Sequence, residues 1–324
     1  MPPDRRLKVK FWGTRGSIPV AMTSAEVRRK LIAALLRASG RRLETPEQAA
    51  SFLDRELDFA GSHTFGGNSS CVEIVTGQRD FVLCDLGSGA RVFGNEVLAT
   101  RGASGQRFHV FMSHPHWDHI MGFPFFMPAY TAGNVIRIYG CHADLEEAFR
   151  GQHAAPSFPV DYSRLPATIE FVRLEPDRDY ENAGLRVRPK RQRHGGDSYG
   201  YRFQAGDTVV VYSTDAEHKQ DELAEIKAFA EFFRDADLVI FDSQYSLAEA
   251  TSIKEDWGHS SNVVGLELCQ MAHAKRLCLY HHEPVSDDER IAALLAETRR
   301  LEEITHTDHR VQIVAAYDGM EIAL

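Results

Sequence analysis

The sequence has no long apolar run and few cysteines. No uninterrupted apolar stretch approaches the ~18 residues that a bilayer-spanning helix needs, and the opening MPPDRRLKVKFWG lacks the apolar centre of a secretory signal peptide. The five cysteines are scattered and never form a CxxC pair, a pattern typical of a reducing compartment. We therefore expect a soluble, cytoplasmic protein without a membrane partner.

An excess of positive charge is also missing. The formal net charge is -9, which argues against bulk electrostatic attraction to nucleic acid. Bound divalent cations would reverse the sign of the potential locally, but only at their own site. We therefore expect a small substrate rather than a long polyanion.

The 324-residue chain contains no internal repeat, low-complexity tract or Gly/Ser linker. Strand-like runs dominate the first half and helical patterns are inserted between strands later, which favours a sheet-based α/β domain over a helical bundle. We expect one domain over residues 1–324, with a helical insertion at about residues 21–60. Strands are predicted at residues 7–12, 71–76, 80–85, 108–113, 135–140, 169–174, 185–189, 201–203, 208–213, 238–242, 276–281 and 311–317. Later helices are predicted within residues 219–236, 260–274 and 286–303, the last with a capping box at Ser286.

Two helices are predicted inside the insertion at residues 21–60. Thr23 and Glu26 form a capping-box pattern, and Pro46 follows Thr45 at the first position of a second helix. The insertion carries six arginines and lysines between residues 28 and 42. They fit a solvated helix face, a lid or a dimer contact, and the sequence does not decide among these.

Three histidines and an aspartate crowd the stretch SHPHWDHIMG at residues 113–122, directly after the apolar run FHVFM. His114 and His116 are two residues apart at the end of a predicted strand, where a period of two sends side chains to one face. Asp118 and His119 follow in the turn. Imidazole and carboxylate are ligands that zinc and manganese accept. The stretch therefore predicts a metal site.

Further ligand candidates lie where downstream strands meet loops, which is where sheet proteins assemble sites. They are His194 in RQRHGGD, Asp215 in STDAE and His281 in HHEP. His218, three residues past Asp215, is predicted to be a surface residue and not a ligand.

The ordered set HPHWDH, His194, Asp215 and His281, with Asp85 in the earlier string LCDLGSG, resembles the metallo-β-lactamase superfamily. Further strings resemble its phosphodiesterase branch, which includes ribonuclease Z and small cyclic-nucleotide phosphodiesterases. They are FWGTRGSIP (11–19), FGGNSSCVEI (65–74), HGGDSYGYRF (194–203), FDSQYS (241–246), GHSS (258–261) and LYHHEP (279–284). The resemblance covers nearly the whole chain apart from residues 21–60.

The resemblance implies an αββα sandwich of two mixed sheets with helices outside and two metal ions at one edge. One metal would be held by His114, His116 and His194, the other by Asp118, His119 and His281, and Asp215 would bridge both. Asp85 would orient the HxHxDH loop from behind the ligands. Zinc is the expected metal, with manganese as the alternative. His281 is chosen over the adjacent His282 because it follows the strand directly.

The same resemblance implies phosphodiester hydrolysis by a hydroxide that bridges the two metals. The catalytic set is then Asp118, His259 and Asp242. His259 in GHSS is the candidate proton donor to the leaving group, with Asp242 beside it. The glycine-rich strings at 13–17 and 65–70 would close the site, with Arg15, Asn68 or Ser69 lining the pocket.

Three functions compete. The first is hydrolysis of a small phosphodiester, most readily a cyclic nucleotide. The second is a ribonuclease Z-like tRNA 3′-end endonuclease, disfavoured because residues 119–194 lack the long glycine- and lysine-rich arm of those enzymes. The third is a non-catalytic binding or sensor protein, disfavoured because every ligand position is filled. β-Lactam and thioester hydrolases rank lower, since they lack the GHSS histidine. A homodimer is expected by analogy with relatives.

Overall fold

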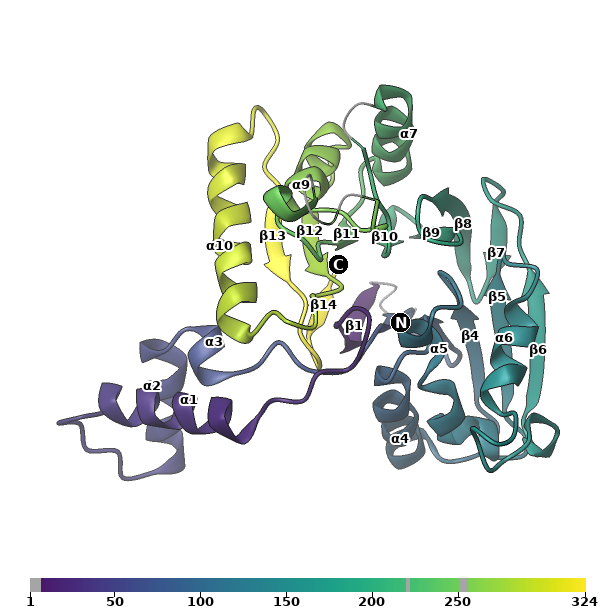
Figure 1. The fold of residues 1–324 in the computed structure, drawn as a ribbon, viewed down its shortest axis with the longest axis horizontal. Coiled ribbons are helices and arrows are strands. Elements are labelled where there is room, and N and C mark those ends of the chain that lie inside the picture. The colour runs from purple at the N-terminus through teal and green to yellow at the C-terminus, as the bar shows by residue number, and fades with distance from the viewer. Residues whose placement is uncertain (1–6, 220–221, 251–253, 255) are drawn as a thin grey trace, which may run out of the picture.

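Two seven-stranded sheets form the centre of the computed structural model, which describes residues 7–219, 222–250, 254 and 256–324 (Figure 1). The first sheet has the order β14-β1-β2-β3-β4-β5-β6 and the second the order β13-β12-β11-β10-β9-β8-β7. Strands β3 to β6 run parallel, as do β10 to β13, and the remaining neighbours are antiparallel. Both sheets are therefore mixed, as predicted.

The strands of the first sheet are β1 (Lys8–Gly13), β2 (Cys71–Val75), β3 (Phe81–Cys84), β4 (Arg107–Phe111), β5 (Val135–Gly140), β6 (Thr168–Arg173) and β14 (Glu321–Ala323). Those of the second are β7 (Tyr180–Asn182), β8 (Leu185–Gln192), β9 (Ser198–Ala205), β10 (Thr208–Ser213), β11 (Leu238–Asp242), β12 (Arg276–Tyr280) and β13 (Gln312–Ala315). Strands β7 and β14 were not predicted. Each has only three residues, too few for an alternating pattern to emerge.

The main core lies between the two sheets. Phe111 of β4 stacks on Tyr139 of β5 at a ring distance of 4.8 Å and meets Tyr201 of β9 edge-on at 5.5 Å. Side chains alternate between the two faces of a strand, so Phe108 and Val110 of β4 lie on the opposite face from Phe111. They pack in a second cluster under the outer helices. Because apolar layers lie on both faces of each sheet, the predicted αββα sandwich is confirmed.

The outer helices pack on both sides of the sandwich. Helices α4 (Gly89–Arg101) and α6 (Leu145–Gln152) cover the first sheet, whereas α7 (Leu223–Phe233), α9 (Asn262–Met271) and α10 (Asp288–Thr305) cover the second. The short helices are α5 (Trp117–Ile120), α8 (Leu247–Ala250) and the 3₁₀ turns η1 (Phe123–Phe125), η2 (Met127–Tyr130) and η3 (Tyr162–Arg164). None of the helices in the described ranges is long and apolar enough to cross a membrane.

Three details differ from the prediction. Helices α4 and α6 lie in the first half, which was predicted to be dominated by strands; α4 contains two glycines and has no side-chain cap, so its helical signal is weak. Helix α10 is capped by Asp287, which accepts from the Arg290 amide, and not by Ser286. Residues 220 and 221 of the predicted helix 219–236 lie outside the described residues.

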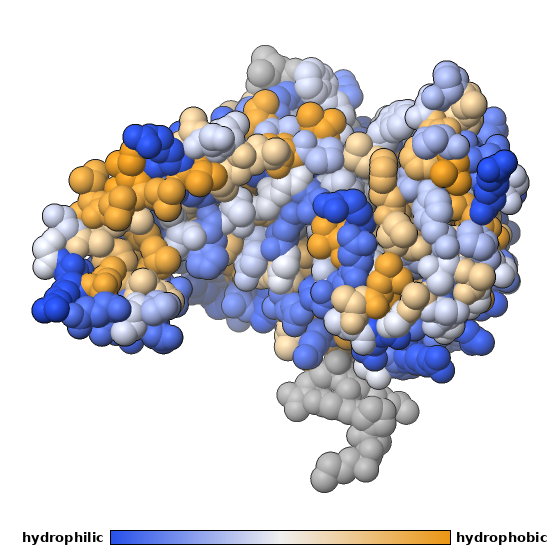
Figure 2. Space-filling view, turned by 90° about the horizontal axis from the view of Figure 1, so that it is seen from below, coloured by the Kyte–Doolittle hydropathy of each residue, from blue (hydrophilic) through white to orange (hydrophobic). Residues whose placement is uncertain are grey.

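Residues 24–62 form α1 (Ser24–Arg37), α2 (Pro46–Glu56) and α3 (Phe59–Ser62) between β1 and β2. The capping box of Thr23 and Glu26 and the cap at Thr45 are present as predicted. Helix α1 has no buried residue. Figure 1 shows α1 and α2 extending sideways from the sheets, and Figure 2 shows apolar surface gathered at that end of the molecule.

Candidate metal centre

The loop after β4 brings its ligand candidates to the edge of the first sheet. His114 lies three residues past the end of the strand, and the short helix α5 carries Asp118 and His119 on its first turn. His114 and His119 are fully buried. The loop is anchored at its start because the Ser113 amide donates to Asp85 Oδ1 at 2.7 Å. The hydrogen bond to Asp85 therefore fixes the backbone of the loop that carries these imidazoles.

The second sheet supplies three more candidates at the same end of its strands. His194 follows β8, Asp215 follows β10 and His281 follows β12. Asp215 and His281 both have positive φ, 45° and 62°, a conformation that costs free energy and is concentrated at functional sites. Because β10 and β12 belong to one parallel set, their carboxyl ends open on one edge.

These side chains gather in two adjoining groups. In each group the ligand atoms lie within 4.8 Å of one another; the first is His114, His116 and His194, and the second is Asp118, His119, Asp215 and His281. All seven predicted ligands are therefore brought together.

Asp215 lies between the two groups. Its Oδ2 is 3.6 Å from His114 Nε2 and 3.7 Å from His194 Nε2. Its Oδ1 is 3.2 Å from the Nε2 atoms of both His119 and His281. One carboxylate therefore presents one oxygen to each group, which is the arrangement that a bridging ligand requires.

The donor set fits divalent cations. Nε2 of His114 and Nε2 of His119 are buried without a hydrogen-bond partner, although buried polar atoms in proteins are nearly always partnered. Burial, and next to it the neighbouring His119, lower the pKa of His114 well below its usual value. The ring is therefore neutral at pH 7, the form in which histidine binds metal.

Three of the candidate histidines have their far nitrogen hydrogen-bonded, which fixes each of these three rings with Nε2 facing the cluster. The Nδ1–H of His119 donates to Asp85 Oδ2 at 2.7 Å, that of His194 to the Gly258 carbonyl at 2.7 Å and that of His281 to Gln244 Oε1 at 3.0 Å. Such outer contacts set the tautomer and orientation of metal-binding histidines. The sequence indicated Asp85 but not Gln244 or Gly258.

Two glycines in the predicted motifs are required by close approach to the ligands. A Cβ on Gly16 would lie 2.6 Å from the His281 ring, and one on Gly258, where φ is 83°, would lie 2.4 Å from His194 Nδ1. The adjacent Ser17 amide donates to Asp118 Oδ2 at 2.7 Å. The GTRGS string therefore contributes backbone to the centre.

Arg15, Asn68 and Ser69 do not point into the cluster. The Arg15 guanidinium donates to the carbonyls of Gly66 and Ser286. Asn68 donates its amide groups to Asp318, and Ser69 accepts from the Ser88 amide through Oγ. These contacts tie loops together, so the expectation that these residues line the pocket receives no support.

His259 and Asp242 form a buried pair beside the cluster. The Nδ1–H of His259 donates to Asp242 Oδ2 at 2.8 Å, and its ring lies 5.0 Å from that of His194 and 5.2 Å from that of His281. Burial lowers the pKa of His259, but the Asp242 carboxylate outweighs it and raises the pKa to about 9. His259 therefore carries a proton at neutral pH.

The two remaining histidines near the motifs lie elsewhere. His282 points away from the cluster, where its Nε2 donates to the Ala316 carbonyl at 2.8 Å. His218 was predicted to be a surface residue, and this prediction is wrong. It is buried, its ring packs against Phe229 at 4.3 Å and Phe241 at 5.6 Å, and neither ring nitrogen has a hydrogen-bond partner.

Comparisons with known proteins agree with this architecture. A family model described as beta-lactamase superfamily domain matches residues 82–282. Ribonuclease Z from Acaryochloris marina is 26% identical over 272 residues, which cover 69% of this chain and 83% of that protein. Ribonuclease Z from Staphylococcus saprophyticus is 27% identical over 130 residues, covering 38% of this chain and 39% of that protein. The chain thus spans well under half the length of this second relative.

Solved structures show the same fold. The metallo-beta-lactamase fold protein YhfI from Bacillus subtilis superposes with a TM-score of 0.66 at 17% identity, covering 99% of this chain and all of that one. Yeast PDE1 superposes with a TM-score of 0.63 at 12% identity, covering 98% of this chain and 99% of that one. The resemblance drawn from the sequence motifs is therefore confirmed, and the chain belongs to the beta-lactamase superfamily.

Proposed function

We propose that this protein is a binuclear metal-dependent phosphodiesterase. The observation that carries the proposal is the two-sided position of Asp215, whose Oδ1 faces His119 and His281 while its Oδ2 faces His114 and His194. His114, His116 and His194 would hold one ion and Asp118, His119 and His281 the other. When bound, two divalent cations, zinc or alternatively manganese, lower the pKa of water and neutralise charge on a phosphoryl group.

His259 is the proposed acid for the leaving group. Its Nδ1–H is engaged by Asp242, so the proton available to a substrate is the one on Nε2. Asp242 is itself held by the amides of Ala216 and Gln244 at 3.1 Å and 3.2 Å, and so it keeps the imidazole oriented and protonated. An alkoxide leaving group needs a proton as its bond to phosphorus breaks, and a positioned histidine contributes ~10²–10⁴-fold to such steps.

Asp118 completes the proposed catalytic set. Its Oδ2 accepts from the Ser17 amide at 2.7 Å and lies 3.2 Å from both His119 Nε2 and His281 Nε2. The carboxylate would orient the attacking water by accepting one of its hydrogen bonds. The hydrogen bond from the Ser17 amide fixes the orientation of this carboxylate.

A nucleotide is the proposed substrate, and a cyclic mononucleotide the specific candidate. Trp117 is 70% exposed and follows His116, whose Nδ1 lies 3.1 Å from His194 Nε2. Trp257 is 61% exposed and precedes Gly258, which binds the other nitrogen of His194. Two exposed tryptophans are thus next in sequence to residues that contact His194, and stacking of a base on an aromatic ring contributes ~1–3 kcal/mol.

The alternative is a ribonuclease Z-like endonuclease, and it is favoured by the name that the relatives carry. Against it, residues 123–173 form η1, η2, β5, α6, η3 and β6, with no projecting arm in this stretch. The test is a panel of cyclic mononucleotides, cyclic dinucleotides, bis(p-nitrophenyl) phosphate and precursor tRNA, compared by kcat/KM. A higher kcat/KM for precursor tRNA would replace the cyclic-nucleotide phosphodiesterase with the endonuclease. Binding of one of these compounds without turnover would favour a sensor protein.

A homodimer is proposed from the exposed apolar face of α1. Leu31, Leu35 and Leu36 are largely exposed on a helix with no buried residue, and exposed patches of this kind mark interaction sites. A second copy is the proposed partner. Light scattering of the wild type and of a Leu31→Glu, Leu35→Glu variant tests it, with a dimer expected for the first and a monomer for the second; a monomeric wild type would refute it.

A further inference from the structure

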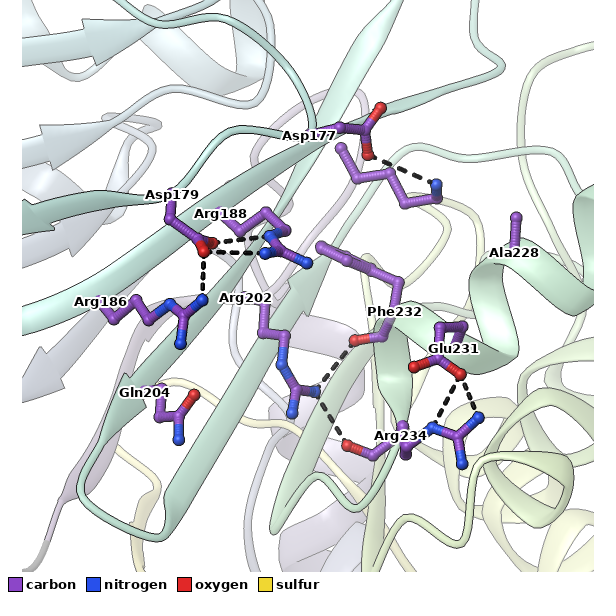
Figure 3. Close-up of a pocket in the computed structure, with 11 residues that line it drawn as sticks. Asp177, Asp179, Arg186, Arg188, Arg202, Gln204, Ala228, Glu231, Phe232 and Arg234 are labelled. Atoms are coloured by element: carbon purple, nitrogen blue, oxygen red, sulfur yellow. Dashed lines mark hydrogen bonds and ion pairs between the residues drawn. The ribbon is translucent and has the colours of Figure 1, made fainter.

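A cavity of about 310 Å³ whose lining includes four arginines lies on the outer face of the second sheet, away from the metal centre. Figure 3 shows Arg186, Arg188 and Arg202 projecting from neighbouring strands, with Phe232 and Arg234 closing the far side. Lys190 completes its cationic lining, and none of the seven ligand candidates borders it.

The cations share one face because of strand alternation. Arg186, Arg188 and Lys190 are spaced by two along β8, so their side chains project on the same side, while Leu185 and Val187, at the alternate positions, enter the core. The antiparallel register pairs Arg188 of β8 directly with Arg202 of β9. Two guanidinium groups on directly opposed residues repel each other, and such a pair destabilises a sheet unless an anion compensates it.

The carboxylates of the chain compensate this charge only in part. Asp179 accepts from both Arg186 and Arg188, Arg234 pairs with Glu231, and Lys190 forms an ion pair with Asp177. Within the described ranges no carboxylate forms an ion pair with Arg202, whose Nη1 instead donates to the carbonyls of Phe232 and Arg234 at 3.0 Å and 2.9 Å. Burial, and next to it Arg188, lower the pKa of Arg202. The cavity is thus locally positive on a chain whose net charge is -9.

We propose that this arginine cavity is a second, non-catalytic site that binds a phosphate-bearing small molecule, with a pyrophosphate-type group as the ligand chemistry. Guanidinium groups recognise phosphate oxygens through paired N–H donors, and Nε and Nη2 of Arg202 are not engaged by the described residues. The exposed ion pairs to Asp179 are worth little in water, so Arg186 and Arg188 can exchange that partner for a phosphate. The cavity volume lies at the lower end of the range for small-ligand sites.

The site is connected to the metal centre through β8. Lys190 and Ala228 also border a neighbouring cavity that is lined by Arg193 and His194. Arg188 precedes His194 by six residues, which corresponds to about 20 Å of extended chain. A single cyclic mononucleotide bound at the metals therefore does not reach the arginine cavity, and the two sites bind separate molecules.

Calorimetric titration of the metal-loaded protein with inorganic pyrophosphate tests the proposal. The variants are Arg188→Gln and, as matched control, Arg137→Gln, which removes an exposed strand arginine that is likewise paired with a carboxylate, Glu170. Binding of pyrophosphate at the metals is common to all three proteins. We expect an additional binding event in the wild type and the control that is weakened at least about tenfold in Arg188→Gln, since hydrogen bonds to charged groups contribute ~1.5–3 kcal/mol.

A second variant, Arg186→Gln, should weaken the same event while leaving the opposed pair of Arg188 and Arg202 intact. Thermal unfolding of each protein without ligand checks that the variants are folded. If a nucleoside diphosphate binds in the arginine cavity more tightly than pyrophosphate, the ligand of this cavity is a nucleotide. Equal titration curves for the wild type, Arg188→Gln and Arg186→Gln would overturn the proposal, and would do so whether or not the protein hydrolyses phosphodiesters.

Discussion

The Nδ1 atom of His119 lies 2.7 Å from Oδ2 of Asp85, and both side chains are fully buried. Asp85 also accepts from the amide and hydroxyl of Ser113 and from the hydroxyl of Tyr212, each at 2.7 Å. Four donors thus converge on one carboxylate, and His119 can keep only its Nε2 free for the cluster. The carboxylate acts on the centre through the imidazole that it orients.

Asp85→Asn should therefore weaken metal binding without removing a ligand. An asparagine side chain carries two N–H donors of its own, which would face groups that are themselves donors. We expect a loss of metal affinity of about 10–100-fold, the usual effect of losing such an outer contact, measured by competition with a chelating dye. The control is Asp80→Asn, whose carboxylate contacts His109 outside the cluster; equal affinities of the two variants would contradict this role.

Asp215→Ala should abolish phosphodiester turnover and lower the metal content. The substitution removes the carboxylate that faces both ligand groups. Asp207→Ala removes the same charge from an exposed turn and should behave as the wild type. Turnover of bis(p-nitrophenyl) phosphate and metal analysis of both variants provide the check, and retained turnover in Asp215→Ala would rule out the proposed mechanism.

His259→Ala should spare the metal content and slow the enzyme selectively. A proton donor matters most when the leaving group is a poor one, so hydrolysis of an alkyl leaving group should fall by ~10²–10⁴-fold, whereas a nitrophenolate leaving group should be affected much less. Asp242→Asn should show the same selectivity in weaker form, because it leaves the imidazole in place but removes the negative charge that raises the pKa of His259. A uniform loss on both substrates would argue against a role as acid.

Protonation of the buried His218 should destabilise the fold as the pH falls. Burial lowers the pKa of His218 to about 4, below the ~6.5 of an unfolded chain. As the pH falls, the unfolded state therefore binds the proton before the folded state does. The free energy of unfolding decreases between pH ~6.5 and about 4, by up to about 3 kcal/mol. His218→Leu should flatten this dependence in denaturant titrations, whereas His63→Leu at an exposed position should not. Identical pH profiles for the two variants would show that His218 does not contribute.

Most of the candidate centre could be predicted from the sequence because its side chains have a chemical signature. His114, Asp215 and His281 follow apolar strands, and their residue types at strand ends indicate metal ligation. The contacts that orient them carry no such signature. The amide of Ser17 and the carbonyl of Gly258 act through the backbone, which every residue has, so only the fold brings them to Asp118 and His194.

The limits of the fold prediction have the same origin. Helix α4 contains Gly89 and Gly94, both of which approach neighbouring segments closely, so its formation depends on tertiary packing more than on helix propensity. His218 looks like any polar loop residue until the rings of Phe229 and Phe241 are folded around it. The arginine cavity depends on the register between Arg188 and Arg202, which are fourteen residues apart and which no local pattern pairs.

The most direct test of the central claim is to locate the metal ions themselves. Crystals of the protein grown with zinc, with anomalous diffraction recorded above the zinc edge, should give two peaks, one on each side of Asp215, and metal analysis of the same sample should give about two equivalents per chain. Loss of the peak on the His114 side in a His114→Ala crystal would assign the two groups separately. No peak among these seven side chains at saturating metal, or a single peak that does not touch Asp215, would contradict the account.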